Sequence, residues 1–129
     1  SVGFSLNSYS SSADFSGCEE YIRKICAMLL REPLPNGICL NVNFPALPAS
    51  EIKGMVVARQ ASGNWQEEFE KRKDPAGKTY YWLTGNFINR EPEASDTDDW
   101  AIQNGYVSVV PVTTDMTAYG FMETLKSKF

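Results

Sequence analysis

Three aspartates close together in the chain, Asp96, Asp98 and Asp99, come nearest to a metal-binding pattern. Hard cations such as Mg²⁺ and Ca²⁺ take carboxylate oxygens as ligands. An EF-hand loop, however, needs a glycine at its sixth position and a glutamate at its twelfth, whereas this run continues into the apolar helical stretch 100–102. Aspartate and threonine are favoured helix N-caps, so helix capping is the preferred interpretation and metal binding the alternative. We therefore predict that these aspartates do not bind a metal.

Histidine does not occur in the sequence. This excludes Ser-His-Asp and Cys-His catalysis, histidine-ligated zinc and an imidazole general base within the chain. Any chemistry must use carboxylates, hydroxyls or amides, or a site that another segment supplies. Cys18, Cys26 and Cys39 make an odd number without the paired spacing of metal ligands, and the first two are two helical turns apart. Buried free thiols are the expected state.

Amide and guanidinium side chains on and near two predicted strands could bind an anion or a polar ligand. Asn41 and Asn43 project from one face of a strand, where they either contact a ligand or, as we prefer, satisfy backbone groups left free by nearby prolines. Arg59 and Gln60 follow another predicted strand. The fork of Arg59 suits phosphate or carboxylate, and an ion pair would use it equally well. The acidic partners considered for it are Glu67, Glu68 and Glu70.

The bulk composition is that of one globular domain. The chain has 129 residues, 43% of them hydrophobic, which suffices for a single core. Its net charge of -4 argues against a nucleic acid or an anionic membrane as the main partner, and the one basic run, residues 71–73, follows glutamates that largely cancel its field. The sequence contains neither an apolar stretch of the ~20 residues that span a bilayer nor a signal-peptide pattern. We therefore predict a soluble, cytoplasmic protein.

Hydrophobic periodicity predicts an α/β arrangement in residues 1–58. Ser16 and Glu19 fit a capping box that begins an amphipathic helix, and Pro33 lies just after its expected end. A strand that begins at residue 2 suggests a piece cut from a longer polypeptide. The predicted elements are strands at 2–6, 38–44 and 55–58, with the helix between the first two.

Residues 59–90 are predicted to form a long β-hairpin arm. Asp74, Pro75 and Gly77 occupy the first, second and fourth positions of a type I turn at its tip. The remaining residues, 91–129, are predicted to hold a short helix, a strand and a final helix. The short helix begins at Asp96–Asp99 and ends at Gly105, the strand 106–110 is closed by Pro111, and Asp115 caps the final helix.

Aromatic residues are dense in the arm, beyond what an isolated two-stranded hairpin can bury. A base-stacking platform for nucleic acid is one interpretation. Because the chain is acidic, we prefer a protein partner, most simply another copy of the chain, in a homodimer or homotetramer. The final helix either packs on its own core or swaps onto a neighbour. The residues predicted at such interfaces are Phe69, Tyr80, Tyr81, Trp82 and Met122.

Several short motifs in a fixed order give the chain a resemblance to a known family. They are Leu40-Asn41-Val42-Asn43-Phe44-Pro45, Arg59-Gln60, Trp65, Asp74-Pro75-Ala76-Gly77 with Tyr80-Tyr81-Trp82 behind it, and Asp96-Thr97-Asp98 leading to Gly105-Tyr106-Val107-Ser108. Together they resemble the C-terminal half of the stationary-phase survival protein SurE family, metal-dependent 5'/3'-nucleotidases and acid phosphatases. The resemblance spans nearly the whole chain. It implies a Rossmann-like α/β core, a projecting hairpin, and a C-terminal helix exchanged between subunits of dimers or tetramers.

The same resemblance implies that the chemistry lies upstream of this segment. The family's Asn-Asp-Asp-Gly loop is not found here, and the pair Asp98-Asp99 precedes Trp100 rather than glycine. A divalent cation, Mg²⁺ or Mn²⁺, would be bound by residues outside this chain and would polarise the phosphoryl group of a nucleoside monophosphate. Within this chain, Arg59, Gln60 and Trp65 are predicted to lie near the substrate or a partner's active site.

One function is preferred and one is kept as the alternative. The preferred function is that of a segment of a SurE-type nucleotidase that completes the fold and the oligomer without a catalytic residue of its own. Residues 1–58 would end the α/β core, 59–90 would form the arm, and 91–129 would add the short helix, strand and C-terminal helix. The alternative is a non-catalytic, homo-oligomerising interaction module derived from that family.

Overall fold

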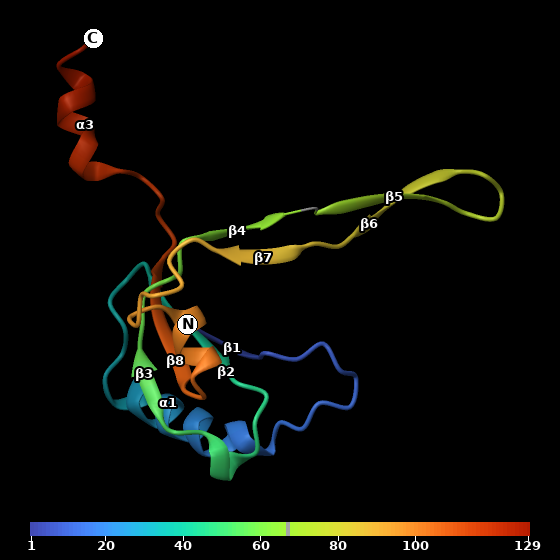
Figure 1. The fold of residues 1–129 in the computed structure, drawn as a ribbon. Helices are drawn as coiled ribbons and strands as arrows, with labels where there is room; N and C mark the ends of the chain where they lie inside the picture. Colours follow the sequence, from blue (N-terminus) through green and yellow to red (C-terminus); the bar gives the residue numbers. More distant parts are fainter. Residues whose placement is uncertain (67) are drawn as a thin grey trace.

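The computed structural model describes residues 1–66 and 68–129 as a mixed α/β fold with a long projecting arm (Figure 1). Its sheet has four strands in the order β1 (Val2–Leu6), β2 (Ile38–Phe44), β8 (Val107–Thr113) and β3 (Met55–Val57). β1 and β2 are parallel, β8 is antiparallel to β2, and β3 is parallel to β8. The three strands predicted in residues 1–58 are thus present.

Helices cover both faces of this sheet. α1 (Glu19–Arg31) packs on the face formed by alternate residues of β2, and its hydrophobic side includes the buried Ile25. α2 (Asp98–Gln103) contacts β8 and β2, and Ala101 is fully buried there. The core cluster comprises Cys18, Ile25, Leu40, Val42, Phe44, Ile52, Val107 and Val109. The prediction that Asn41 and Asn43 share one face of this strand is confirmed, because Leu40, Val42 and Phe44, which alternate with them, are the buried residues.

The start of α1 differs from the predicted capping box. Residues Ser16–Cys18 form a 3₁₀ turn, and no side chain caps α1 at Cys18. The Asp14 carboxylate instead accepts hydrogen bonds from the backbone N–H of Ser16 at 2.8 Å and from its hydroxyl at 2.9 Å. A carboxylate two residues upstream took the role of the cap, so the capping-box prediction was wrong although the helix itself was right.

The strand β8 continues through Pro111 to Thr113, whereas the sequence predicted that Pro111 would close it. Pro111 lies opposite Leu40, whose own N–H donates to Ser1 on the β1 side. The pair is therefore one of the antiparallel positions that exchange no hydrogen bonds, and the proline nitrogen faces the other side of β8. β3 pairs with β8 only as far as Val109, so no ladder hydrogen bond is lost.

The predicted arm is a long hairpin that extends away from the sheet (Figure 1). Near the sheet, β4 (Gly63–Gln66) pairs with β7 (Asn86–Asn89), and further out β5 (Phe69–Lys73) pairs with β6 (Thr79–Leu83). The predicted turn closes the tip, where Gly77 donates to Asp74 and adopts a φ of 79°, a conformation that glycine permits. Because both pairs have few neighbours, most of their side chains are exposed.

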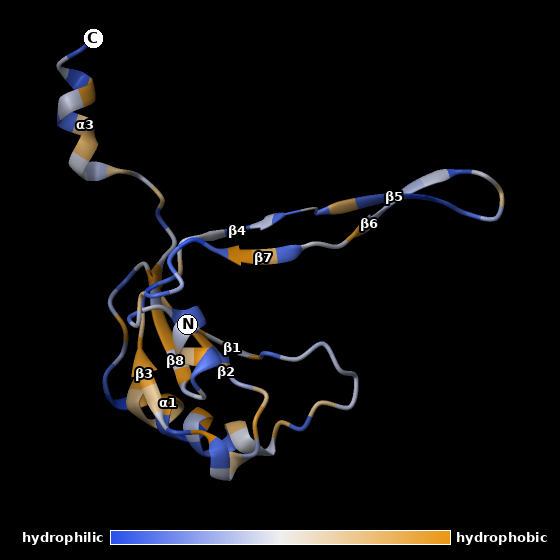
Figure 2. Ribbon diagram, viewed as in Figure 1, coloured by the Kyte–Doolittle hydropathy of each residue, from blue (hydrophilic) through white to orange (hydrophobic). Residues whose placement is uncertain are grey.

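The C-terminal helix α3 (Tyr119–Lys126) lies apart from the sheet (Figure 1). Asp115 does not cap it, because its carboxylate accepts hydrogen bonds from Thr117 and from the Tyr119 hydroxyl, and the helix begins four residues later. These contacts lower the pKa of Asp115 to about 2, first through Thr117. All residues 113–129 are exposed. Figure 2 shows that apolar as well as polar residues occur along α3. The sequence predicted that this helix either packs on its own core or swaps onto a neighbouring copy, and packing on its own core is not observed.

Two further features concern the described residues. No helix there is long and apolar enough to cross a membrane. Cys18, Cys26 and Cys39 carry free thiols, as predicted, but only Cys18 is buried. Burial, helped by the negative charge of Asp14, raises the pKa of the Cys18 thiol.

Candidate functional site: a cleft between the sheet and the arm

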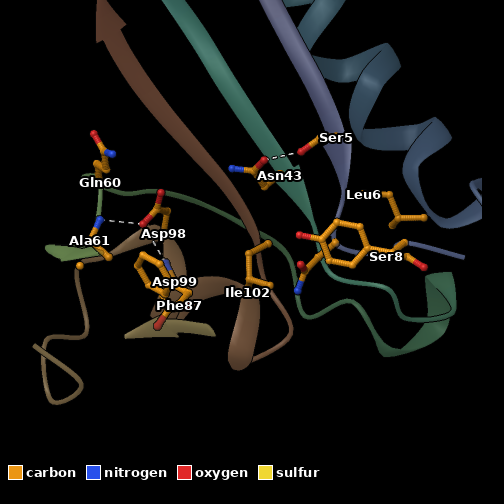
Figure 3. A pocket seen from close by; sticks show the side chains of 13 residues that line it. Ser5, Leu6, Ser8, Asn43, Gln60, Ala61, Phe87, Asp98, Asp99 and Ile102 are labelled. Atoms are coloured by element: carbon orange, nitrogen blue, oxygen red, sulfur yellow. Dashed lines mark hydrogen bonds between the residues drawn. The ribbon is translucent and has the colours of Figure 1, made fainter. Parts of the chain in front are cut away.

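A cleft of about 410 Å³ lies beside α2, near the ends of β1 and β2 and the base of the arm (Figure 3). Four parts of the chain form its walls, and each is placed there by a different pairing. They are residues 5–9 of β1 and the loop after it, Asn43 of β2, residues 60, 61 and 63 with Phe87 at the arm, and Asp98, Asp99 and Ile102 of α2. The cleft therefore exists only where strands, helix and arm meet.

A polar row crosses the sheet at the floor of this region. Ser5 and Asn43 are paired in register, and the Ser5 hydroxyl donates to the Asn43 side-chain oxygen (Figure 3). Asn43 is also in register with Ser108 of β8, whose buried hydroxyl has no hydrogen-bond partner in the part of the chain that the structure describes. Asn43 thus bonds to a side chain, and the preferred interpretation that it satisfies backbone groups was wrong.

Asp98 and Asp99 line the cleft, and each uses one carboxylate oxygen to hold the structure together. Asp98 Oδ1 accepts from the backbone N–H of Ala61 at 2.8 Å and of Asp99 at 2.9 Å. Asp99 Oδ2 accepts from Asn89 at 2.6 Å and from Gln103 at 2.8 Å. The two aspartates therefore tie the arm to α2, and they make the cleft acidic.

The helix cap at this end of α2 is Thr97. Its side-chain oxygen accepts from the N–H of Trp100 at 3.2 Å, while its hydroxyl donates to the carbonyl of Ala94. Thr97 is fully buried. The prediction of a helix start here, with acidic residues in its first turn, is confirmed, and the capping atom belongs to the threonine inside the acidic run.

Arg59 is engaged by two carboxylates at the base of the arm. Its guanidinium nitrogens lie 2.6 and 2.9 Å from the oxygens of Glu91, and 2.8 and 3.0 Å from those of Asp96. The arm glutamates considered as its partners were wrong for Glu68, which does not contact it, and for Glu70, which bonds to Arg72. Glu67 lies outside the described residues. The geometry is the bidentate one that suits carboxylates, so the ion-pair interpretation of Arg59 is the one observed.

These contacts perturb the acid–base properties of all three side chains. The Arg59 guanidinium, with a further hydrogen bond from Ser62, lowers the pKa of Glu91 to about 2. It also lowers the pKa of Asp96, and the two carboxylates together raise the pKa of Arg59. The charge of Arg59 is thus already balanced within the protein, which leaves little of it for an anionic ligand.

The other two residues predicted near a substrate take different places. Gln60 lines the cleft beside Ala61 (Figure 3). Trp65 lies on β4 and borders a second cleft, of about 530 Å³, together with Tyr9, Glu68, Leu83, Thr84 and Gly85. Tyr9 borders both clefts. Gln60 and Trp65 therefore line two adjoining clefts, whereas Arg59 forms ion pairs at the base of the arm.

Several cleft residues were not predicted from the sequence, among them Ser5, Tyr9, Ala61 and Phe87. Ser5 could have been found from the alternation of β1 combined with its parallel register to β2. Tyr9 belongs to an irregular serine-rich loop, and no pattern in the sequence indicates it. Phe87 is one of the arm aromatics, and local sequence does not indicate its place in the cleft, because that place depends on the pairing of β4 with β7.

The residues of the cleft suit hydrogen bonding to a polar ligand better than metal binding. Among the described residues, no group of three or more acidic or cysteine side chains is placed to hold a metal ion. Asp98 and Asp99 each have one oxygen already hydrogen-bonded within the protein. A divalent cation of the kind the sequence resemblance implies does not fit the donor set of this chain alone.

The predicted interface residues lie on the two projecting parts of the molecule. On the outer hairpin of the arm, the exposed fractions are 63% for Phe69, 64% for Tyr81 and 54% for Trp82. Tyr80 and Met122 are less exposed, at 39% and 38%. The Arg72 guanidinium lies 5.2 Å from the centre of the Trp82 ring, a cation–π contact within the hairpin. These side chains are accessible to a partner.

Comparison with known proteins gives a consistent result. The family model described as survival protein SurE matches residues 1–67. The chain is 49% identical over 126 residues to the 5'-nucleotidase SurE of Flavobacterium psychrophilum, covering 98% of this chain and 49% of that protein. It is 51% identical to the 5'-nucleotidase SurE of Christiangramia forsetii, again over 98% of this chain and 48% of the relative.

A solved structure agrees with the sequence comparison. The crystal structure of the SurE protein from Aquifex aeolicus superimposes with a TM-score of 0.73 at 35% identity, over 98% of this chain and 50% of that one. The chain thus spans about half the length of the relatives it matches. The predicted Rossmann-like α/β fold is confirmed by this neighbour. Sequence and structure together establish that this chain belongs to the SurE family.

Proposed function

We propose that this chain is the C-terminal part of a SurE-type 5'/3'-nucleotidase, which hydrolyses the phosphate monoester of nucleoside monophosphates. The observation that carries the proposal is identity near 50% to proteins named 5'-nucleotidase SurE over 98% of the chain. In this proposal the chain completes the sheet and builds the oligomer, and the catalytic aspartates lie in a preceding half. A cytoplasmic location and a lack of nucleic-acid or membrane partners stay predictions.

The composition of the cleft supports this division of labour. It offers amide, hydroxyl and carboxylate groups from Asn43, Ser5 and Asp98, but among the described lining residues it has no basic side chain. A phosphate group would be repelled by the two aspartates unless a cation lay beside it. A divalent metal, Mg²⁺ or Mn²⁺, held by residues outside this chain would supply that charge and polarise the phosphoryl group.

The open side of the sheet also supports a preceding half. β1 is an edge strand of the described sheet, and its apolar residues Val2, Phe4 and Leu6 are only half-buried although they face the core. An unpaired edge of this kind invites pairing with another strand. Further strands beyond β1 would bury these side chains.

The oligomeric part of the proposal rests on the arm and α3. The exposed aromatic residues of the outer hairpin and the exposed apolar residues of α3 are accessible on two separate projections. We propose that they contact other copies of the chain in a homodimer or homotetramer. The alternative function, a non-catalytic interaction module, shares these contacts and differs only in lacking the hydrolytic half.

The test is phosphate release from a nucleoside monophosphate in the presence of Mg²⁺ or Mn²⁺. The purified 129-residue chain is compared with a polypeptide in which the same chain follows an N-terminal SurE half. Activity only in the longer polypeptide is expected. Equal activity per mole in the 129-residue chain would overturn the proposed division, and Asp98 and Asp99 would then be substituted first. Inactivity of both, with the longer polypeptide folded, would favour the interaction module.

A further inference from the structure

We propose that Trp65 at the base of the arm and Tyr9 in the loop after β1 form a binding site for the nucleobase of the substrate. This inference rests on the proposed function, because it assigns a part of the same substrate. The polar cleft beside it would then receive the sugar. The site is argued from the position of the two clefts, from the packing of the rings and from the charge of the walls.

The two clefts adjoin each other through shared or touching aromatic residues. Tyr9 borders both, and Phe87 of the first cleft contacts Trp65 of the second, with ring centres 6.1 Å apart at an angle of 63°. Their volumes, about 410 and 530 Å³, together lie in the range of small-molecule sites. A ligand with a polar and a flat apolar part could extend from one cleft into the other.

The rings in this region keep open faces. Trp65 is 49% exposed and Tyr9 is 97% exposed, although both are large apolar side chains. The edge of one ring meets the face of the other in the Trp65–Phe87 pair, so the pair holds Trp65 without covering it on every side. A nucleobase stacks on such a surface whatever its identity, because every base has a π-face.

The backbone fixes the orientation of these rings. Trp65 lies opposite Phe87 in the β4–β7 register, which places both side chains on one face of the hairpin. The Phe87 ring lies over Gly63, where a Cβ atom would approach ring carbon Cζ to 2.4 Å. Glycine at this position therefore leaves the space that Phe87 occupies. The pairing of Glu91 with Arg59 and with the Ser62 N–H holds the start of β4 next to the end of β7.

The difference between the walls decides which part of the ligand enters which cleft. Asn43, Asp98 and Asp99 in the first cleft carry hydrogen-bond acceptors that suit the hydroxyl donors of a ribose. The second cleft is bordered by Glu68 and Thr84 as well, but Trp65, Tyr9 and Leu83 give it a mostly apolar wall, which suits a flat and less polar group. The phosphate, repelled by the aspartates, would project away from both, towards the part of the protein that supplies the cation.

The first test measures binding without hydrolysis. Adenosine and ribose are titrated into the 129-residue chain, and heat or tryptophan fluorescence is recorded. We expect saturable binding of adenosine and far weaker binding of ribose. Trp65→Ala should weaken adenosine binding by about tenfold, and Trp65→Phe, which keeps a ring, by much less. Phe15→Ala removes an exposed ring from the same loop as Tyr9 but outside both clefts, and should bind as the wild type does.

The outcomes of this test are decisive for the site. If Trp65→Ala binds adenosine as tightly as the wild type, or if ribose binds as well as adenosine, the nucleobase site is wrong. A lack of any saturable adenosine binding by the wild-type chain would also overturn it. Circular dichroism of each variant separates a lost site from a lost fold.

The second test separates this inference from the proposed function. The longer polypeptide is assayed with a nucleoside monophosphate and with ribose 5-phosphate, which lacks the base. Trp65→Ala should raise KM for the nucleotide about tenfold and leave the constants for ribose 5-phosphate unchanged. Equal effects on both substrates would overturn the nucleobase site while leaving the nucleotidase intact. If neither substrate is hydrolysed by the wild type, the proposed function fails, and the adenosine titration alone decides the site.

Discussion

At the scale of single residues, Arg59 shows how one side chain sets the geometry around the cleft without entering it. Its guanidinium binds Glu91 and Asp96 on two sides, and Glu91 also accepts from Ser62. Arg59 lies 32 positions before Glu91 and 37 before Asp96 in the sequence, yet the three side chains meet at the base of the arm. The site is therefore organised by residues that lie behind its walls.

Acid should weaken this junction in a defined pH range. The folded-state pKa of Glu91 is about 2, below its ordinary value of 4.5, so below 4.5 the unfolded chain binds a proton that the folded chain does not. The stabilisation is complete above pH 4.5 and is lost as the pH falls towards 2. Urea unfolding at a series of pH values should show this loss in the wild type and a smaller one in Glu91→Gln. Arg59→Gln should behave similarly, and undiminished pH dependence in both variants would contradict the assignment.

Even the smallest side chain at position 63 should destabilise the fold. Alanine there would bring Cβ within 2.4 Å of Phe87 and 2.7 Å of the Ile88 carbonyl, so the ring and the strand must move. We expect Gly63→Ala to lower the free energy of unfolding by about 1–3 kcal/mol, as overpacking does. Gly3→Ala on β1 is the matched control, because nothing lies within 4 Å of its Cβ. Urea denaturation compares the two, and equal stability would show that Phe87 does not pack on Gly63.

At the scale of elements, α2 links the sheet, the arm and the cleft. It is only six residues long, so its stability depends on its cap and on packing rather than on its own propensity. Thr97 caps it, Asp98 holds Ala61, and Asp99 holds Asn89. Loss of this helix would therefore displace both the α2 residues and the arm residues that line the cleft.

The cap of α2 can be tested directly. Thr97→Ala removes the acceptor for the Trp100 N–H in a fully buried place, and should lower the free energy of unfolding by about 1–2 kcal/mol. Thr97→Ser keeps the oxygen and should recover much of this difference. Thr114→Ala, at an exposed position after β8, provides the control. If thermal or urea unfolding of Thr97→Ala matches that of Thr114→Ala, the cap contributes nothing.

At the scale of the whole molecule, the arm and α3 extend from a small core in two directions (Figure 1). Apolar side chains are exposed on both, including Phe69 and Leu83 on the arm and Phe121 and Leu125 on α3. Exposed apolar surface of this kind marks contact sites when it is contiguous. This arrangement is what the proposed homo-oligomer would use.

A charge on α3 should reduce self-association. Met122 is exposed on α3, and Met122→Glu would place a carboxylate in the proposed contact between copies, where burial without a partner is costly. Sedimentation velocity should show a dimer or tetramer for the wild type and smaller species for this variant. Met116→Glu, before the helix and 96% exposed, should assemble normally. A monomeric wild type, or a Met122→Glu variant with unchanged assembly, would argue against the α3 contact.

The sequence by itself determined the elements and their faces. Alternation along residues 38–44 placed Asn41 and Asn43 on one face of β2, helical spacing identified α1, and the Asp-Pro-x-Gly turn identified the tip of the arm. These features depend on side-chain period and on turn chemistry within a few residues, which a single sequence records directly. The order of the motifs was also enough to indicate the SurE family.

Only the tertiary structure decided which distant residues meet. Arg59 pairs with Glu91 and Asp96 rather than with Glu70, which is nearer in sequence. Asn43 bonds to Ser5 rather than to the backbone. Pro111 fits inside β8 because β3 pairs with β8 only as far as Val109. The cleft likewise joins four separate parts of the chain. Each of these outcomes depends on strand register and on the packing of elements far apart in sequence, and neither is contained in local periodicity.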